Sequence, residues 1–70
     1  MEDNTRRDIR RLLKSFGVQA DNALMDHISR NPNVGSFRVR VTLEDLTDYG
    51  EAPKQGALGL EIEEEISGAG

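Results

Sequence analysis

The sequence predicts an α+β fold in which two helices precede two antiparallel strands, and three patterns carry this prediction. Apolar residues recur at helical spacing over residues 5–16 and 20–30. Over residues 37–43 and 58–66, apolar and polar residues alternate with the period of half-buried strands. Glycine, proline and asparagine separate these segments. We therefore expect a single small domain over residues 5–66, with the two helices packed on one face of a β-hairpin.

The first expected helix is amphipathic and has a basic outer face. Thr5 and Asp8 have the spacing of a capping box at its start. On a wheel of about 100° per residue, its apolar side chains fall between about 240° and 340° and its basic ones between about 0° and 140°. The basic residues are Arg6, Arg7, Arg10, Arg11 and Lys14. Gly17 suits the left-handed residue that follows a helix end, so we expect this helix to stop at residue 16.

The second expected helix has a weaker apolar stripe. Its members are Ala20, Ala23, Leu24 and Ile28. His27 lies within the stripe, and its ordinary pKa is near neutrality, so a general base or a pH switch would depend on it. A lone histidine in such a stripe is more often a hydrogen-bonded residue at the edge of the core, and we interpret it so. The run Asn-Pro-Asn-Val-Gly over residues 31–35 should end this helix.

The two expected strands have complementary faces. Antiparallel pairing would place apolar side chains opposite one another on one face, and arginine opposite glutamate on the other. Arg38 and Arg40 would each pair with a glutamate of the second strand. Glu64 falls in the apolar register, which predicts a place at the rim of the sheet, where its carboxylate can reach water.

The remaining segments are expected to be irregular. Residues 1–4 should fray, and the small residues 67–70 should form a disordered tail. The connection over residues 44–57 is far longer than the usual hairpin loop of about two to five residues. Leu46 and Tyr49 are expected to pin this connection to a core made by the apolar residues of the helices and strands.

Composition narrows the classes of function. The chain of 70 residues has a net charge of -4, no cysteine and one histidine. Disulfides are therefore ruled out, and no metal or other cofactor is expected. Residues 1–35 carry six basic and five acidic side chains, whereas residues 36–70 carry three and eight. This balance argues against nucleic acid or an anionic membrane as a partner of the whole chain. We expect no signal segment, no membrane span and a cytoplasmic location.

Three runs of the sequence resemble a known family. They are IRRLLKSFGV over residues 9–18, VRVTLEDL over residues 39–46 and LEIEEEI over residues 60–66. In this order the chain resembles a family of short uncharacterised bacterial proteins, a domain of unknown function, and the resemblance covers residues 6–66. It implies the same succession of helix, helix, strand and strand. It lends no activity and no binding residue to any position of this chain.

We expect a noncatalytic protein that acts through protein–protein contact, and not an enzyme. A two-stranded hairpin with unpaired edges is marginal on its own, so a homodimer is expected to complete the fold. The long connection over residues 44–57 is able to reach a neighbouring copy. The identity of any other protein partner is unknown.

Two groups of residues are candidates for contact with a partner. The basic face of the first helix, with Arg6, Arg7, Arg10, Arg11 and Lys14, has the clustering that phosphate contact requires, so weak nucleic-acid binding is the alternative function. Two simpler interpretations of this face do not involve nucleic acid. The basic side chains are either exposed to solvent or paired with acidic residues of the same protein or of a partner. In the long loop, Asp48, Tyr49 and Glu51 are candidate contacts, against the simpler interpretation of solvated acids around a loop anchor.

Overall fold

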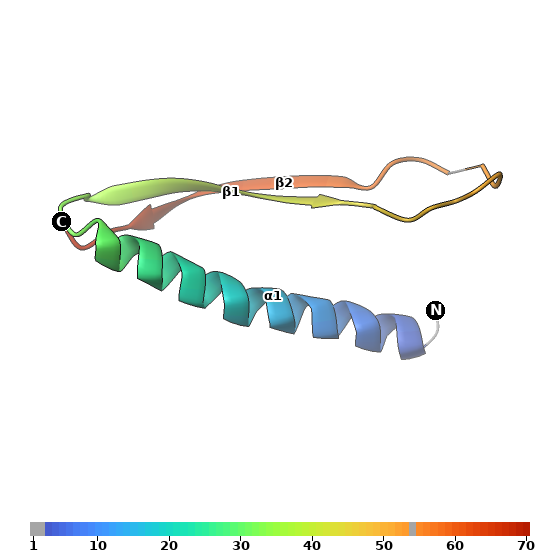
Figure 1. Cartoon of the computed structure of the whole chain (residues 1–70), viewed down its shortest axis with the longest axis horizontal. Helices are drawn as coiled ribbons and strands as arrows, with labels where there is room; N and C mark the ends of the chain where they lie inside the picture. The colour runs from blue at the N-terminus through green and yellow to red at the C-terminus, as the bar shows by residue number, and fades with distance from the viewer. Residues whose placement is uncertain (1–2, 54) are drawn as a thin grey trace. The chain divides into compact units, whose positions relative to one another are not determined.

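A computed structural model describes residues 3–53 and 55–70, which form one helix and one two-stranded sheet. The helix α1 (Asp3–Arg30) is followed by the strands β1 (Ser36–Glu44) and β2 (Gly59–Ser67) (Figure 1). The α+β class is therefore confirmed. The chain divides into two compact units, residues 1–35 with 68–70 and residues 36–67, and each is described by itself below.

The prediction of two separate helices is wrong, because α1 is continuous over 28 residues. Gly17 lies inside it and is not among the glycines with positive φ. A single glycine costs a helix only about 1 kcal/mol relative to alanine. Good helix formers surround it, among them leucine, arginine and lysine before it and glutamine and alanine after it. Continuing the helix through Gly17 therefore costs less than interrupting its hydrogen bonds.

The end of α1 agrees with the sequence prediction. The N–H of Asn31 donates to the carbonyl of Ile28 at 3.1 Å, and its side-chain amide donates to the carbonyl of His27 at 2.8 Å. These bonds satisfy carbonyls that lack a partner in the last turn. Pro32 disfavours a helical conformation at Asn31, so the helix cannot continue.

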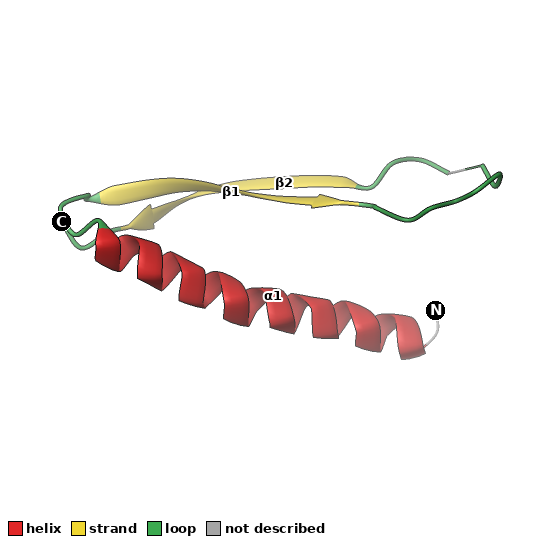
Figure 2. Cartoon of the chain, viewed as in Figure 1, coloured by secondary structure: helices red, strands yellow, loops and turns green. Residues whose placement is uncertain are grey.

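The predicted antiparallel hairpin is confirmed (Figure 2). Each strand starts or ends within one residue of the predicted bounds, since β1 covers residues 36–44 and β2 covers residues 59–67. One face carries the apolar pairs Phe37–Ile66, Val41–Ile62 and Leu43–Leu60, together with Val39–Glu64. The other face carries the polar pairs Ser36–Ser67, Arg38–Glu65, Arg40–Glu63 and Thr42–Glu61. The register therefore separates an apolar face from a charged one, as the alternating sequence requires.

The last residues are ordered by backbone hydrogen bonds, so the prediction of a disordered tail over residues 67–70 is corrected. Ser67 ends β2, the N–H of Gly68 donates to the carbonyl of Gly35 at 2.8 Å, and the N–H of Gly70 donates to that of Val34 at 3.2 Å. A Cβ at Gly70 would lie 2.6 Å from the carbonyl carbon of Asn33, so this approach needs a residue without a side chain. At the other end, Asp3 and Asn4 are helical rather than frayed, and residues 1–2 lie outside the described residues.

The expected core is not present among the described residues, none of which is buried. Leu12, Leu13 and Leu58 each expose more than half of their surface, and Leu46 exposes 86%. A single helix and a single hairpin have one apolar face each, and neither unit contains a second layer that could cover that face. The apolar residues of this chain therefore form surfaces.

Replacing Gly17 with alanine distinguishes one helix from two. Within a continuous helix, G17A should stabilise α1 by about 0.5–1 kcal/mol, because alanine loses less backbone entropy and no atom lies within 4 Å of the added Cβ. The measurement is helical ellipticity during thermal unfolding. The control is G50A, which should destabilise because Gly50 has a φ of 60°. A loss of ellipticity in G17A would mean that the helix stops at this residue.

Candidate interaction surfaces

Continuity of α1 joins the first predicted apolar stripe to the second, except for Ile28, which lies about 100° from Ile9 on the helix surface. At about 100° per residue, the sector within about 60° of Ile9 contains eight apolar or histidine side chains, Ile9 included, and the polar residues Thr5, Arg6 and Arg30 at its ends. We call the eight apolar or histidine residues the α1 stripe: Ile9, Leu12, Leu13, Phe16, Ala20, Ala23, Leu24 and His27. Phe16 exposes 47% of its surface and Leu13 exposes 59%, whereas Ala20 and Leu24 are half-buried. The stripe extends over most of the helix, which the predicted break at Gly17 had concealed.

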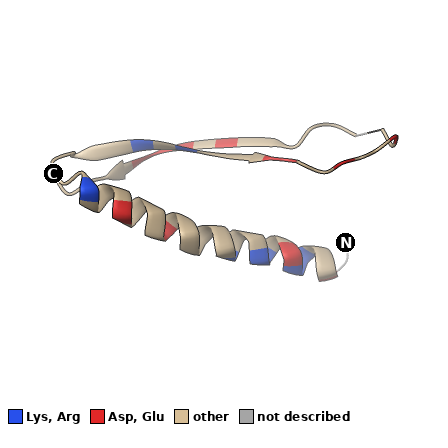
Figure 3. Ribbon diagram, viewed as in Figure 1, with Lys and Arg blue, Asp and Glu red and all other residues tan. Residues whose placement is uncertain are grey.

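The basic face lies on the first turns of α1, where Figure 3 shows Lys and Arg gathered near the N-terminus. Arg7 donates to the side-chain carbonyl of Asn4 at 2.9 Å, and Arg11 lies 3.7 Å from the carboxylate of Asp8. The other members of the predicted face make no hydrogen bond or ion pair with the described residues; they are Arg6, Arg10 and Lys14. Pairing within the helix therefore neutralises only part of this charge.

His27 belongs to the α1 stripe, one turn from the end of the helix. Its backbone carbonyl accepts the bond from Asn31 described above. Within the described ranges, no three histidine, cysteine, aspartate or glutamate side chains form a group that could hold a metal ion. No helix of these ranges combines the length and the hydropathy that crossing a bilayer requires.

On the charged face of the hairpin, one glutamate binds both arginines. The carboxylate of Glu63 lies 3.2 Å from Arg38 Nη2 and 2.6 Å from Arg40 Nη2. Arg38 was predicted to use a separate glutamate, and the register does place it opposite Glu65. Instead Glu65 accepts a bond from the hydroxyl of Ser36 at 3.0 Å, and the long arginine side chain reaches its diagonal neighbour. The prediction of two separate pairs is therefore wrong, although both arginines are paired.

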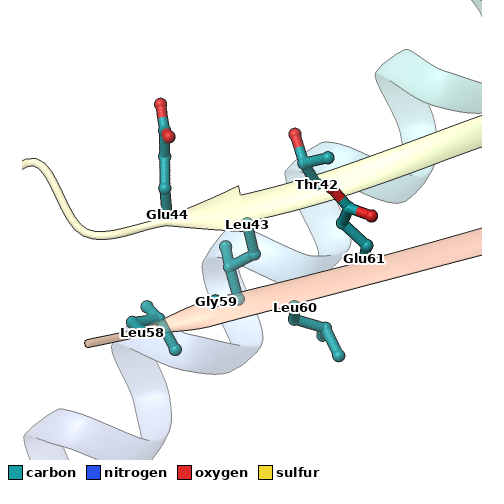
Figure 4. A pocket seen from close by; sticks show the side chains of 7 residues that line it. All are labelled: Thr42, Leu43, Glu44, Leu58, Gly59, Leu60 and Glu61. Atoms are coloured by element: carbon teal, nitrogen blue, oxygen red, sulfur yellow. The ribbon is translucent and has the colours of Figure 1, made fainter. Parts of the chain in front are cut away.

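An open hollow lies where the two strands lead into the long loop (Figure 4). It is lined by Thr42, Leu43, Glu44, Leu58, Gly59, Leu60 and Glu61. Thr42 and Glu44 point to one side of the hairpin, while Leu58 and Leu60 point to the other. The lining offers two carboxylates and one hydroxyl without an imidazole or an amine that could activate them. Its three leucines continue the apolar face of the hairpin.

The loop between the strands is organised by Asp45, which the sequence prediction interpreted as one of the solvated acids of the loop. Its carboxylate accepts the N–H of Thr47 at 3.0 Å and the hydroxyl of Tyr49. Asp48 accepts the N–H of Gly50 at 2.9 Å. Asp45 and Asp48 each accept a bond from the N–H two residues further on, which is typical of aspartate in turns. The position of aspartate two residues before Thr47 and Gly50 is the feature of the sequence that could have predicted these bonds.

The three predicted loop contacts therefore differ in their roles. Asp48 and Tyr49 bond within the loop, whereas Glu51 makes no hydrogen bond or ion pair with the described residues. Leu46 does not anchor the loop, since its side chain is almost fully exposed. Tyr49 acts as an anchor inside the loop instead.

The hydrogen bond between Tyr49 and Asp45 affects the pKa of the tyrosine. The hydrogen bond to the carboxylate, desolvation and the repulsion of two anions raise the pKa of Tyr49 above 10.0. A raised pKa favours the neutral phenol in the folded loop, so its contribution to stability is lost as the pH rises through that pKa. Tyr49 is the single tyrosine and the chain has no tryptophan, so absorbance at alkaline pH reports on it alone.

We expect D45N to lower the pKa of Tyr49 toward its ordinary value in a spectrophotometric titration. The matched control is D48N, which removes a neighbouring loop carboxylate that bonds to the backbone and not to the phenol. Equal titration curves for the native chain and D45N would contradict the bond.

The comparisons with known proteins assign no role to these surfaces. No family model, no curated protein and no solved structure matches this chain. The resemblance to a family of short bacterial proteins stays a prediction. Any function must therefore be argued from the α1 stripe, the hairpin faces and the distribution of charge.

Proposed function

We propose that this chain is a noncatalytic protein that acts through protein–protein contact and forms a homodimer. The observation that carries the proposal is the exposure of apolar side chains on both units, combined with the lack of any buried residue in the described ranges. Isolated exposed apolar residues are common on protein surfaces, but continuous apolar faces mark interaction sites. Here they form a stripe along α1 and one face of the hairpin.

Self-association supplies the stability that each unit lacks. Burying a leucine, isoleucine or phenylalanine side chain contributes about 1.5–3 kcal/mol, and α1 alone offers Ile9, Leu12, Leu13 and Phe16. A monomeric helix in water is marginal even when its sequence favours helix, because nucleation is costly. A second copy would cover the same apolar residues on both partners at once, which is why a homodimer is favoured over contact with a foreign protein.

We also propose that dimerisation adds strands to the sheet. The described sheet contains β1 and β2 alone, so each strand has one edge whose backbone groups lack a strand partner. A hairpin of this kind is marginal in water without a third strand or a packed layer. Packing of helical residues on the apolar face of the hairpin, as the sequence predicts, belongs to the same proposal. A cytoplasmic location is proposed as well, supported by the absence of cysteine from the sequence.

One observation favours nucleic-acid binding as the second candidate. Arg6, Arg10 and Lys14 lie on the first turns of α1 without a partner among the described residues, so their charge is available to phosphate. Against it stand the net charge of -4 and the four glutamates of β2. This candidate therefore ranks below self-association.

The homodimer predicts that sedimentation equilibrium at about 0.1 mM will give a mass near twice that of the chain, since that concentration suits micromolar dissociation constants. L13Q should raise the dissociation constant at least about tenfold, because it removes about 1.4 kcal/mol or more of apolar burial. M25Q is the matched control, since Met25 and Leu13 have nearly equal exposure, 58% and 59%, but Met25 lies outside the stripe. A folded monomer at this concentration would refute the proposal.

The triple variant R6Q/R7Q/R10Q separates the two candidates. We expect it to keep the helical ellipticity of the native chain, because exposed surface changes usually alter stability by no more than about 0.5 kcal/mol each. At low salt, the native chain should bind duplex DNA only in the weak, salt-sensitive manner that basic side chains confer. The affinity of the variant for DNA should be lower than that of the native chain. Binding of the native chain that persists at about 200 mM salt would instead favour the nucleic-acid function.

A further inference from the structure

The α1 stripe is complementary to itself when it is read in reverse. The eight members form four pairs, which lie two, five, six and nine residues on either side of position 18. The pairs are Phe16 with Ala20, Leu13 with Ala23, Leu12 with Leu24, and Ile9 with His27. In two antiparallel helices related by a twofold axis at position 18, the members of each pair reach the same level. In the two pairs nearest the axis, a bulky side chain of one copy then meets an alanine of the other, which lets the helices approach and interdigitate there. In the two outer pairs, Leu12 meets Leu24 and Ile9 meets His27, so large side chains of both copies are in contact.

The parallel arrangement lacks this complementarity. It would bring every stripe residue to the level of its own copy, so Phe16 would meet Phe16 and Ala20 would meet Ala20. Large side chains would then hold the first halves of the helices apart, while Ala20 and Ala23 left space beside Leu24 and His27 in the second halves. Packing of small against large residues therefore favours the antiparallel arrangement.

The charges of α1 favour the same direction. The segment from Asp3 to Lys14 carries five basic and two acidic side chains, a net charge of +3. The segment from Gly17 to Arg30 carries one basic and two acidic side chains, a net charge of -1 with histidine neutral. Parallel helices would place +3 beside +3, whereas antiparallel helices place +3 beside -1 at both ends. The ion pairs within the helix, Asp8 with Arg11 and Asp26 with Arg30, do not alter these totals.

We propose that α1 binds the α1 of a second copy as an antiparallel helix pair centred on position 18. The inference rests on the proposed self-association and specifies which surface is used and in which direction. Val18 itself lies about 180° from Ile9, so its side chain points away from the partner helix. Ile9 of each copy lies at the level of His27 of the other.

Single-cysteine chains test this geometry, because the native chain has no cysteine to interfere. Equal amounts of I9C and H27C are mixed, oxidised and weighed by mass spectrometry, which separates the mixed product from the two same-variant products. The antiparallel pair should give a mixed I9C–H27C disulfide in excess of the statistical half of all products. V18C is the matched control and should give only the background of random collision. A second mixture, L13C with A23C, repeats the test without altering His27.

The outcomes separate this inference from the proposed function. Excess mixed products in both mixtures support the antiparallel pair. Products of I9C with I9C as the main species, in a chain that still sediments as a dimer, would overturn the antiparallel geometry and leave self-association intact. Background cross-linking at all positions in a sedimenting dimer would show that another surface is used. A monomer by sedimentation would remove the proposed function, and this inference with it.

Discussion

The constraint on which this molecule depends is that each of its units has one apolar face and no layer of its own to cover it. Helix α1 exposes a stripe from Ile9 to His27, and the hairpin exposes the face that contains Val41 and Ile62. Folding must repay the entropy of ordering every residue, and exposed apolar groups contribute little toward it. In the proposed homodimer, contacts between such surfaces would contribute the missing stability, and association would then be part of folding.

The sequence predicts the hairpin well and the helix poorly, for different physical reasons. Strand alternation has a period of two, so a shift by one residue would exchange the faces, and the apolar pattern therefore excludes such a shift. The break at Gly17 rested on local preference, which is worth about 1 kcal/mol and is easily outweighed by the helix on both sides. The core was inferred from the assumption that apolar residues are buried, and that assumption fails when a chain this small lacks a second layer.

The residue types of the candidate surfaces could be predicted from the sequence, but the pairing of individual side chains could not. Arg38 and Arg40 were correctly assigned to glutamates of β2. Glu63 was not identified as their common partner, because the sequence does not show how far a guanidinium group reaches along a strand. The role of Asp45 was missed because it comes from the turn that this residue closes around Tyr49. The α1 stripe could not be recognised as continuous until Gly17 was placed inside the helix.

The acidic strand has a consequence for the behaviour of the chain at high concentration. Two-stranded hairpins with free edges can stack laterally into fibrils through their backbone groups. In β2 the glutamates occupy positions 61, 63, 64 and 65, so a second β2 laid along this edge would bring eight carboxylates together. Glu64 adds a charge to the apolar face itself, opposite Val39, where a stacked sheet would have to desolvate it. In the proposed homodimer these glutamates would act as gatekeepers, because they would oppose unlimited growth of the sheet and still permit a finite assembly.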